Sequence, residues 1–200
     1  SIRKGFIDLY DMKNFFSILV VSLLALSCSR ISSGDAVIVL DVSDVTSGEV
    51  VFVCQNEMKT VTLDEHGHGE IVLPDVEASY VSMFYMADLS DHALLYVEGG
   101  DVLNVRSTAH DFYKNLTFEG DKASVVSYLN TVKLTALPDE DYALPFDEYI
   151  KKIGAKEKDA VKLMAANGLG KAGIFEEMEK GRIRYSFGTQ VLMYPLGHRF

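Results

Sequence analysis

Cysteine and basic residues are scarce in this sequence. The 200 residues include 2 cysteines and no CxxC, so the dithiol motif of a redox enzyme is absent. Lysine and arginine number 19 against 29 aspartates and glutamates, which gives a formal net charge of −10. Because phosphate binding requires clustered basic side chains, this balance argues against a nucleic-acid partner. A hydrophobic content of 48% predicts a folded chain rather than a disordered one.

An apolar run near the N-terminus is too short to span a membrane. It extends from Phe15 to Leu26, whereas crossing roughly 30 Å of hydrocarbon takes about 20 helical residues. Met12 and Lys13 precede the run and the small residues Ala25 and Ser27 lie at its end, which is the pattern of a signal peptide. We therefore expect residues 12–27 to be a signal peptide. Residues 1–11 are then an upstream extension, because a signal peptide normally begins at its Met.

The end of this segment resembles the lipobox of bacterial lipoproteins. It reads Leu24-Ala25-Leu26-Ser27-Cys28. Leu26, two positions before the cysteine, is larger than the usual Ala or Ser, as in the looser lipoboxes of Bacteroidetes. The resemblance implies cleavage before Cys28 and its lipidation, with residues 28–35 as a tether. Several acyl chains, at ~0.8 kcal/mol per buried methylene, would anchor the protein to a membrane. The absence of an acidic cluster in residues 30–33 favours the periplasmic face of a Gram-negative cell envelope.

Residues 36–120 carry the pattern of β-strands. The segments are short, rich in Val, Ile, Tyr and Phe, and separated by Gly, Asp, Asn or Pro. No segment long enough for a helix intervenes, so an antiparallel β-sandwich or a partly open barrel is expected rather than parallel crossover units. The expected strands lie in AVIVLDV, EVVFVCQ, KTVTLDE, GEIVLPD, SYVSMFYMA, ALLYVEGGDVLNV and LTFEG.

Two histidines occur in the stretch TLDEHGHGEIVL, residues 62–73. The stretch predicts a β-hairpin, in which Gly67 and Gly69 supply the positive φ that a chain reversal needs. The arms would carry Val61 and Leu63 on one side and Ile71 and Leu73 on the other. His66 and His68, with Glu65 or Glu70, could bind a metal. However, a hairpin tip is exposed and mobile, and a catalytic site needs three firmly held ligands, so we expect no metal site.

Residues 121–200 change to a helical period. Asp121 is expected to cap a helix over residues 122–137, a second helix should begin near Pro145 and continue towards Asn167, and a third should span residues 174–194 and end at Pro195. The fold class is therefore α+β. The expected apolar positions are Val125, Leu129 and Val132 in the first helix, Phe146, Tyr149, Ile150 and Ile153 in the second, and Ile174, Met178, Ile183, Phe187 and Val191 in the third.

No residue type or spacing indicates catalysis or a cofactor. Cys54 lies in an apolar strand pattern, typical of a buried cysteine acting as a small hydrophobe. His92, His110 and His198 are isolated in the sequence and are expected to be exposed loop residues. The strand aromatics Tyr80, Phe84, Tyr85 and Tyr96 either belong to the core or line a sugar-binding platform. We therefore expect no catalytic, cofactor-binding or metal residue, and lipidation at Cys28.

The order of several motifs resembles the N-terminal region of thiol:disulfide interchange lipoproteins of Bacteroidetes, the TlpA/ResA-like family with a DUF4369-type domain ahead of a thioredoxin fold. The motifs are the lipobox, D-x-x-G at residues 64–67, LLYVEGGDVLNV at 94–105, FEGDKA at 118–123 and YP at 194–195. The CxxC of that family is missing. The resemblance implies a non-catalytic accessory domain that anchors, spaces, dimerises or presents a substrate to a downstream thioredoxin-like domain. The alternative is a stand-alone lipoprotein that binds glycan or peptide through its sandwich.

Overall fold

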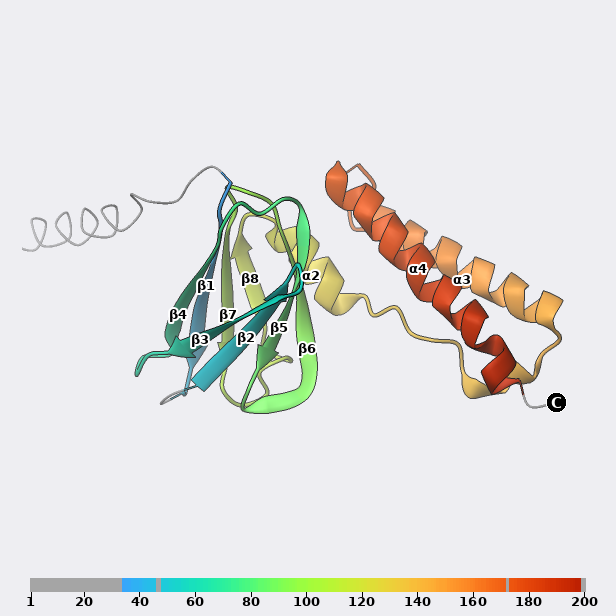
Figure 1. The fold of residues 1–200 in the computed structure, drawn as a ribbon, viewed down its shortest axis with the longest axis horizontal. Helices are drawn as coiled ribbons and strands as arrows, with labels where there is room; N and C mark the ends of the chain where they lie inside the picture. Colours follow the sequence, from blue (N-terminus) through green and yellow to red (C-terminus); the bar gives the residue numbers. More distant parts are fainter. Residues whose placement is uncertain (1–33, 46–47, 172, 199–200) are drawn as a thin grey trace, which may run out of the picture.

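The computed structural model describes residues 34–45, 48–171 and 173–198, and has the expected α+β architecture (Figure 1). Two four-stranded sheets pack against each other and are followed by helices. The strands are β1 (Ala36–Ser43), β2 (Gly48–Cys54), β3 (Glu57–Leu63), β4 (His68–Leu73), β5 (Ser79–Tyr85), β6 (Asp88–Val97), β7 (Val102–Thr108) and β8 (Thr117–Gly120). Cys28 and the expected signal peptide lie outside the described residues.

The two sheets have the orders β4-β1-β7-β8 and β3-β2-β5-β6. All pairs are antiparallel except β1 and β7, which run parallel with Val37 opposite Val102 and Ser43 opposite Thr108. This one parallel pair departs from the wholly antiparallel expectation. After β1 the chain forms β2 and β3 in the second sheet, returns to the first sheet as β4, and then forms β5 and β6 in the second sheet. β7 comes back to the first sheet and lies beside β1 in the same direction. The sheets do not close, so the domain is a sandwich rather than a barrel.

The predicted hairpin at residues 62–73 is wrong. β3 pairs with β2 and β4 pairs with β1, so the turn between them carries the chain from one sheet to the other. Asp64 Oδ1 accepts the backbone N–H groups of His66 and His68, and Gly67 has the expected positive φ of 81°. Gly69 instead lies within β4 at a negative φ, where a Cβ would come within 2.8 Å of Val61 Cγ1. The turn contains the residues of a hairpin turn, but the strands on its two sides form their hydrogen bonds with other strands and not with each other.

The core lies between the sheets and follows the alternation of the strands. In β5, for example, every second side chain is buried, because successive residues of a strand point to opposite faces. Tyr85 stacks on Phe112, from the loop after β7, with ring centroids 4.4 Å apart. The largest buried aliphatic and sulfur-containing side chains between the sheets are Ile38, Leu40, Met83, Leu95 and Leu103.

The helices are α2 (Ala123–Thr131), the short 3₁₀ turn η1 (Asp139–Ala143), α3 (Phe146–Ala166) and α4 (Ile174–Gly197). The first helix is shorter than expected and is not capped by Asp121. The N-cap position is occupied by Lys122 in the left-handed conformation (φ 57°), and the Asp121 carboxylate accepts the backbone N–H of Val102 instead. Pro195 lies inside the last turn of α4 and does not end it.

Helices α3 and α4 form an antiparallel pair, here called the arm, which leads away from the sandwich (Figure 1). Phe175 of α4 and Met164 of α3 pack on Tyr96 of β6 and Tyr128 of α2, at the end of the arm where α3 meets α4. Along the arm the two helices bury Tyr149, Ile153, Ala160, Ile183, Phe187 and Tyr194. Residue 174 was expected on this buried stripe, but Ile174 is 59% exposed and its neighbour Phe175 is buried. No helix of the described ranges is both long and apolar enough to cross a membrane.

Candidate functional site

A hollow of about 440 Å³ lies beside the free edge of β6, between the sandwich and the helices. Four parts of the chain form its walls: β6, the loop at residues 109–116, the C-terminal end of α2 with the residues that follow it, and α4. Its polar lining residues are Asp91, His92, Tyr113, Lys114, Asn130, Lys133, Arg182 and Ser186. We take this groove as the candidate site because it gathers acidic, basic and aromatic side chains from distant parts of the sequence.

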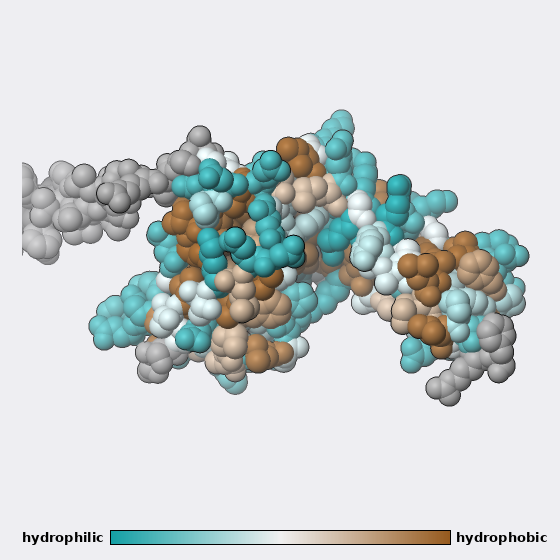
Figure 2. All heavy atoms as spheres, viewed as in Figure 1, coloured by the Kyte–Doolittle hydropathy of each residue, from teal (hydrophilic) through white to brown (hydrophobic). Residues whose placement is uncertain are grey.

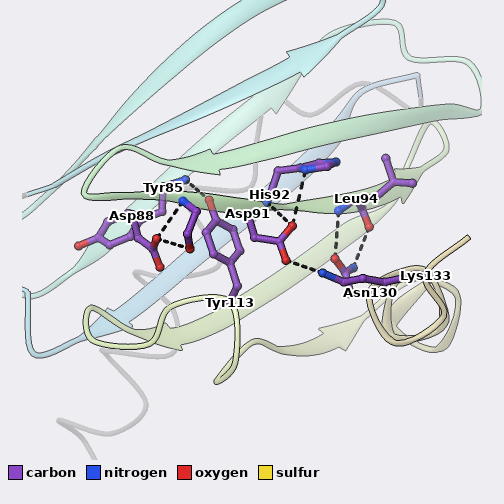
Figure 3. Close-up of polar contacts among 9 residues, drawn as sticks. Tyr85, Asp88, Asp91, His92, Leu94, Tyr113, Asn130 and Lys133 are labelled. Atoms are coloured by element: carbon purple, nitrogen blue, oxygen red, sulfur yellow. Dashed lines mark hydrogen bonds and ion pairs between the residues drawn. The ribbon is translucent and has the colours of Figure 1, made fainter. Parts of the chain in front are cut away.

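The edge of β6 in this groove is capped by side chains (Figure 3). Asn130 of α2 accepts the backbone N–H of Leu94 at 3.0 Å and donates to its carbonyl oxygen at 2.8 Å, much as a neighbouring strand would do. Asn130 also donates to the carbonyl of Val126, one turn earlier in α2, which fixes its orientation. An unpaired strand edge is a template for unwanted pairing. Asn130 therefore both docks α2 and blocks strand addition at Leu94.

The two preceding outward-facing amides of β6 are bonded to carboxylates (Figure 3). Asp88 Oδ1 accepts the backbone N–H of Ser90 at 3.1 Å, and Asp91 Oδ1 accepts that of His92 at 2.9 Å. Hydrogen bonds from Ser90 lower the pKa of Asp88. The Lys133 ammonium, bonded to Asp91 Oδ2, together with the His92 amide, lowers the pKa of Asp91. Both carboxyl groups are thus held in the charged form that accepts hydrogen bonds.

Three more polar residues of the groove are also engaged in structural contacts. The Tyr113 hydroxyl accepts the backbone N–H of Tyr85 at 2.9 Å, and burial raises its pKa. The His92 ring stacks on Phe84, with centroids 5.5 Å apart. Lys114 pairs with Asp111 outside the groove. These contacts position the edge strand, the loop and α2, and they do not arrange a nucleophile beside a base.

Asn130→Ala tests the capping role of this side chain. The change removes both bonds to Leu94 and leaves its N–H and C=O without a protein partner, so we expect a loss of about 1–3 kcal/mol in the free energy of unfolding. Urea denaturation measures this loss. Asn167→Ala is the matched control, because Asn167 donates to a carbonyl at the exposed end of α3 and should cost less than about 0.5 kcal/mol. Equal effects of the two changes would contradict the assignment.

A buried carboxylate joins the arm to the sandwich, and the sequence reasoning missed it. Glu179 of α4 is 0% exposed. Its carboxylate accepts hydrogen bonds from the Tyr80 hydroxyl at 2.8 Å, from the Tyr128 hydroxyl at 3.1 Å, and from Nε and Nη2 of Arg182 at 2.7 Å each. Desolvation, reinforced by the Glu179 charge, raises the pKa of both tyrosine hydroxyls, which therefore stay protonated donors. The fully bonded carboxylate connects β5, α2 and α4.

The sequence did contain a signal for this contact. Glu179 stands four residues after Phe175 and four before Ile183, both of which are buried, so it occupies the same helical face as they do. A lone acid on an apolar face, with Arg182 three residues later, indicates a buried ion pair.

The thiol of Cys54 is buried at one end of the sandwich, as its apolar strand pattern indicates. It is 9% exposed in β2, and burial raises its pKa. A smaller hollow of about 170 Å³ lies beside it, lined by Phe52, Glu57, Leu73 and other residues of the sandwich end. A thiol with a raised pKa is a poor nucleophile at neutral pH. These properties are those of a core residue.

The five histidines occupy different environments. His66 and His68 lie at the turn between β3 and β4, with ring centroids 6.5 Å apart, and no group of three His, Cys, Asp or Glu side chains suited to a metal occurs within the part of the chain that the structure describes. His110 is an exposed turn residue, as expected. His92 is exposed as expected but lies in β6 rather than in a loop. His198 lies in a bend after α4, outside regular structure as expected, but it is half-buried and its Nδ1 lies 2.6 Å from the carbonyl oxygen of Tyr142.

The strand aromatics do not form one platform. Tyr85 points into the core at 2% exposure, and Tyr96 is fully buried. Tyr80 and Tyr96 are neighbours on the outer face of their sheet, but Phe175 of α4 covers them, with centroids 6.5 and 4.9 Å away. Phe84 is engaged with His92. Tyr80 and Tyr96 therefore form the docking surface for the arm rather than an open sugar-binding surface.

Comparison with known proteins gives no relative: no family model, no curated protein and no solved structure matches the chain.

Proposed function

We propose that this chain is a non-catalytic, membrane-anchored accessory domain of an envelope thiol-disulfide oxidoreductase, and that its redox partner is a downstream thioredoxin-like domain. The observation that carries the proposal is the lipobox-like sequence at residues 24–28, placed directly ahead of a folded sandwich. The resemblance to the lipoprotein family rests on motifs and their order, and it supplies the redox context. A lipid on Cys28 would place the domain at the periplasmic face.

The position of the first strand supports anchoring. β1 begins at Ala36, so the segment from Cys28 to the sandwich can extend over at most roughly 28 Å. A tether of this length keeps the sandwich near the membrane surface. The arm leads away from the sandwich (Figure 1), an arrangement suited to a domain that spaces or presents another one.

The structural chemistry supports an accessory role. In the β6 groove, the side chain of Asn130 is hydrogen-bonded to the backbone of β6. In the Glu179 cluster, the carboxylate is hydrogen-bonded to tyrosine hydroxyls of β5 and α2. Both sets of contacts hold secondary structure in place. The Cys54 thiol is buried with a raised pKa, the opposite of an attacking cysteine. The glycan- or peptide-binding alternative relied on four strand aromatics, and the burial of two of them, Tyr85 and Tyr96, favours the accessory role over it.

Replacing Cys28 with Ala tests the anchor. The variant should move from the membrane fraction to the soluble fraction of the cell envelope and should lose incorporation of labelled fatty acid, because alanine has no thiol to carry the diacylglycerol. Cys54→Ala is the control, since this buried cysteine should have no effect on either measurement. Labelling that persists in Cys28→Ala would refute the lipid anchor.

The redox context is tested separately by reading the coding sequence past Phe200. We expect the frame to continue into a segment with a CxxC motif. A stop codon immediately after Phe200 would refute the downstream domain and leave the lipid anchor untouched.

A further inference from the structure

The outer face of α4 carries exposed apolar side chains that no other helix or strand of the described ranges covers. Tyr185 is 79% exposed, Leu192 77% and Leu196 74%. With about 100° between successive helical residues, these positions lie on the side of α4 opposite Ile183 and Phe187, which pack on α3. Figure 2 shows hydrophobic atoms gathered over the end of the arm that is farthest from the sandwich. We call this face, from residue 181 to residue 196, the α4 stripe.

Two glycines on the same face are not required by packing against any of the residues that the structure describes. Gly181 and Gly188 lie inside α4, and a Cβ at either position would meet no atom within 4 Å. Neither has a positive φ, so the backbone does not require glycine. Glycine in a helix interior is less stable than alanine. Its use at two exposed positions, seven residues apart, fits the close approach of a second helix.

From Tyr185 onwards the stripe is without charge, although the chain is strongly acidic, and the exposed Arg184 lies beside its first turn. Residues 185–197 contain no Asp, Glu, Lys, Arg or His, against a net charge of −10 for the whole chain. Two copies would repel each other through most surfaces, but not through this one. A membrane surface fits less well, because helices that lie on membranes carry Lys and Arg on their polar face, whereas the face of α4 opposite the stripe packs on α3. Uncharged apolar centres are typical of homodimer interfaces.

We propose that the α4 stripe is a homodimer interface, in which α4 packs antiparallel on α4 of a second copy. The stripe has heptad spacing, with Gly181, Tyr185, Gly188 and Leu192 following one another by four, three and four residues, as in a two-helix seam.

An antiparallel arrangement also makes the stripe complementary to itself. With the two-fold axis between Gly188 and Thr189, Tyr185 faces Leu192 of the second copy, and Gly181 faces its Leu196. Bulky side chains then meet each other or fill a notch left by glycine. A two-fold axis pairs the same surface on both subunits, as this pattern requires. The interface does not depend on the proposed redox context.

Cysteine cross-linking of the full chain in membranes tests this arrangement. Thr189→Cys lies beside the two-fold axis and should form a disulfide-linked dimer on mild oxidation. Glu177→Cys is the control, because it is an exposed position of the same helix about three turns from the two-fold axis, where the cysteines of two antiparallel copies would lie too far apart to form a disulfide. We expect at least a tenfold higher dimer yield for Thr189→Cys. Equal yields would overturn the proposal.

A second substitution tests the stripe itself. Leu192→Asp, added to Thr189→Cys, should abolish the cross-link, whereas Leu89→Asp, an equally drastic change at a 65% exposed residue of β6, should leave the yield unchanged. Both residues are exposed, so both variants should keep the circular dichroism of the parent. Gly188→Leu should raise the melting temperature of the arm, since leucine favours helix, and still reduce cross-linking. An undiminished cross-link in Leu192→Asp would exclude the α4 stripe as the interface.

Discussion

Replacing Glu179 with Ala should destabilise the protein by about 3–5 kcal/mol, the range observed when one partner of a buried ion pair is removed. The substitution leaves the Arg182 guanidinium without its carboxylate at the boundary of the arm and the sandwich. It also leaves the Tyr80 and Tyr128 hydroxyls without their acceptor. At roughly 2–4 °C per kcal/mol for a chain of this size, the melting temperature should fall by roughly 6–20 °C.

The loss should concentrate where the arm meets the sandwich. Glu179 connects α4 to β5 and α2, whereas the core between the sheets contains none of these contacts. Hydrogen exchange should therefore accelerate first in residues 123–131 and 174–183, before the central strands β1 and β2 exchange. This order separates undocking of the arm from unfolding of the sandwich.

Glu176→Ala is the matched control for Glu179→Ala. Glu176 lies one turn earlier on the same helix and forms an ion pair with Lys180 nearer the surface. Such pairs contribute about 0.3–0.5 kcal/mol. Glu179→Gln keeps the shape and one acceptor oxygen but removes the charge, so its cost should fall between those of the two alanine variants. If Glu179→Ala cost no more than Glu176→Ala, the carboxylate would have no part in holding the arm.

The elements of this fold were predictable because they depend on local patterns. Alternating apolar residues determine β5, and helical spacing determines α3, whose start at Phe146 follows Pro145 as expected. The long-range pairing was not predictable. β1 and β7 are joined by backbone hydrogen bonds, and backbone groups are the same for every residue type except proline, so the sequence does not show which strands pair. Asp121 shows the same limit on a small scale: its carboxylate suits a helix cap, but the N–H of Val102 competes successfully for it.

The candidate groove depends on tertiary contacts, and this is why the sequence did not reveal it. Asn130 looked like one more polar residue on an amphipathic helix, and only the approach of α2 to β6 gives it Leu94 as a partner. The exposed stripe of α4, by contrast, is visible in the sequence as a heptad series. The sequence pattern predicted only one apolar face for this helix, the one that packs on α3. The structure shows that α4 has a second apolar face, which is exposed.

The turn between β3 and β4 gives the second large expected effect. Gly67→Val should cost at least about 3 kcal/mol, because valine is strongly disfavoured at a φ of 81° and its Cβ would overlap the Val42 carbonyl oxygen. The turn cannot move aside easily, since Val42 donates its backbone N–H to the Gly67 carbonyl at 2.9 Å. Urea denaturation of the wild-type chain and the variant measures the difference.

The ranking of changes around this turn distinguishes a structural role from a metal site. Gly69→Val should cost about 1–3 kcal/mol, because its Cβ would meet the side chains of Val61 and Leu63, which can shift in part. His66→Ala with His68→Ala should change stability by less than about 0.5 kcal/mol, since both side chains are exposed and the bonds to Asp64 use backbone N–H groups. Added zinc should stabilise neither the wild-type chain nor the double variant. A zinc-dependent rise in melting temperature that disappears with the histidines would instead establish a metal site at the turn.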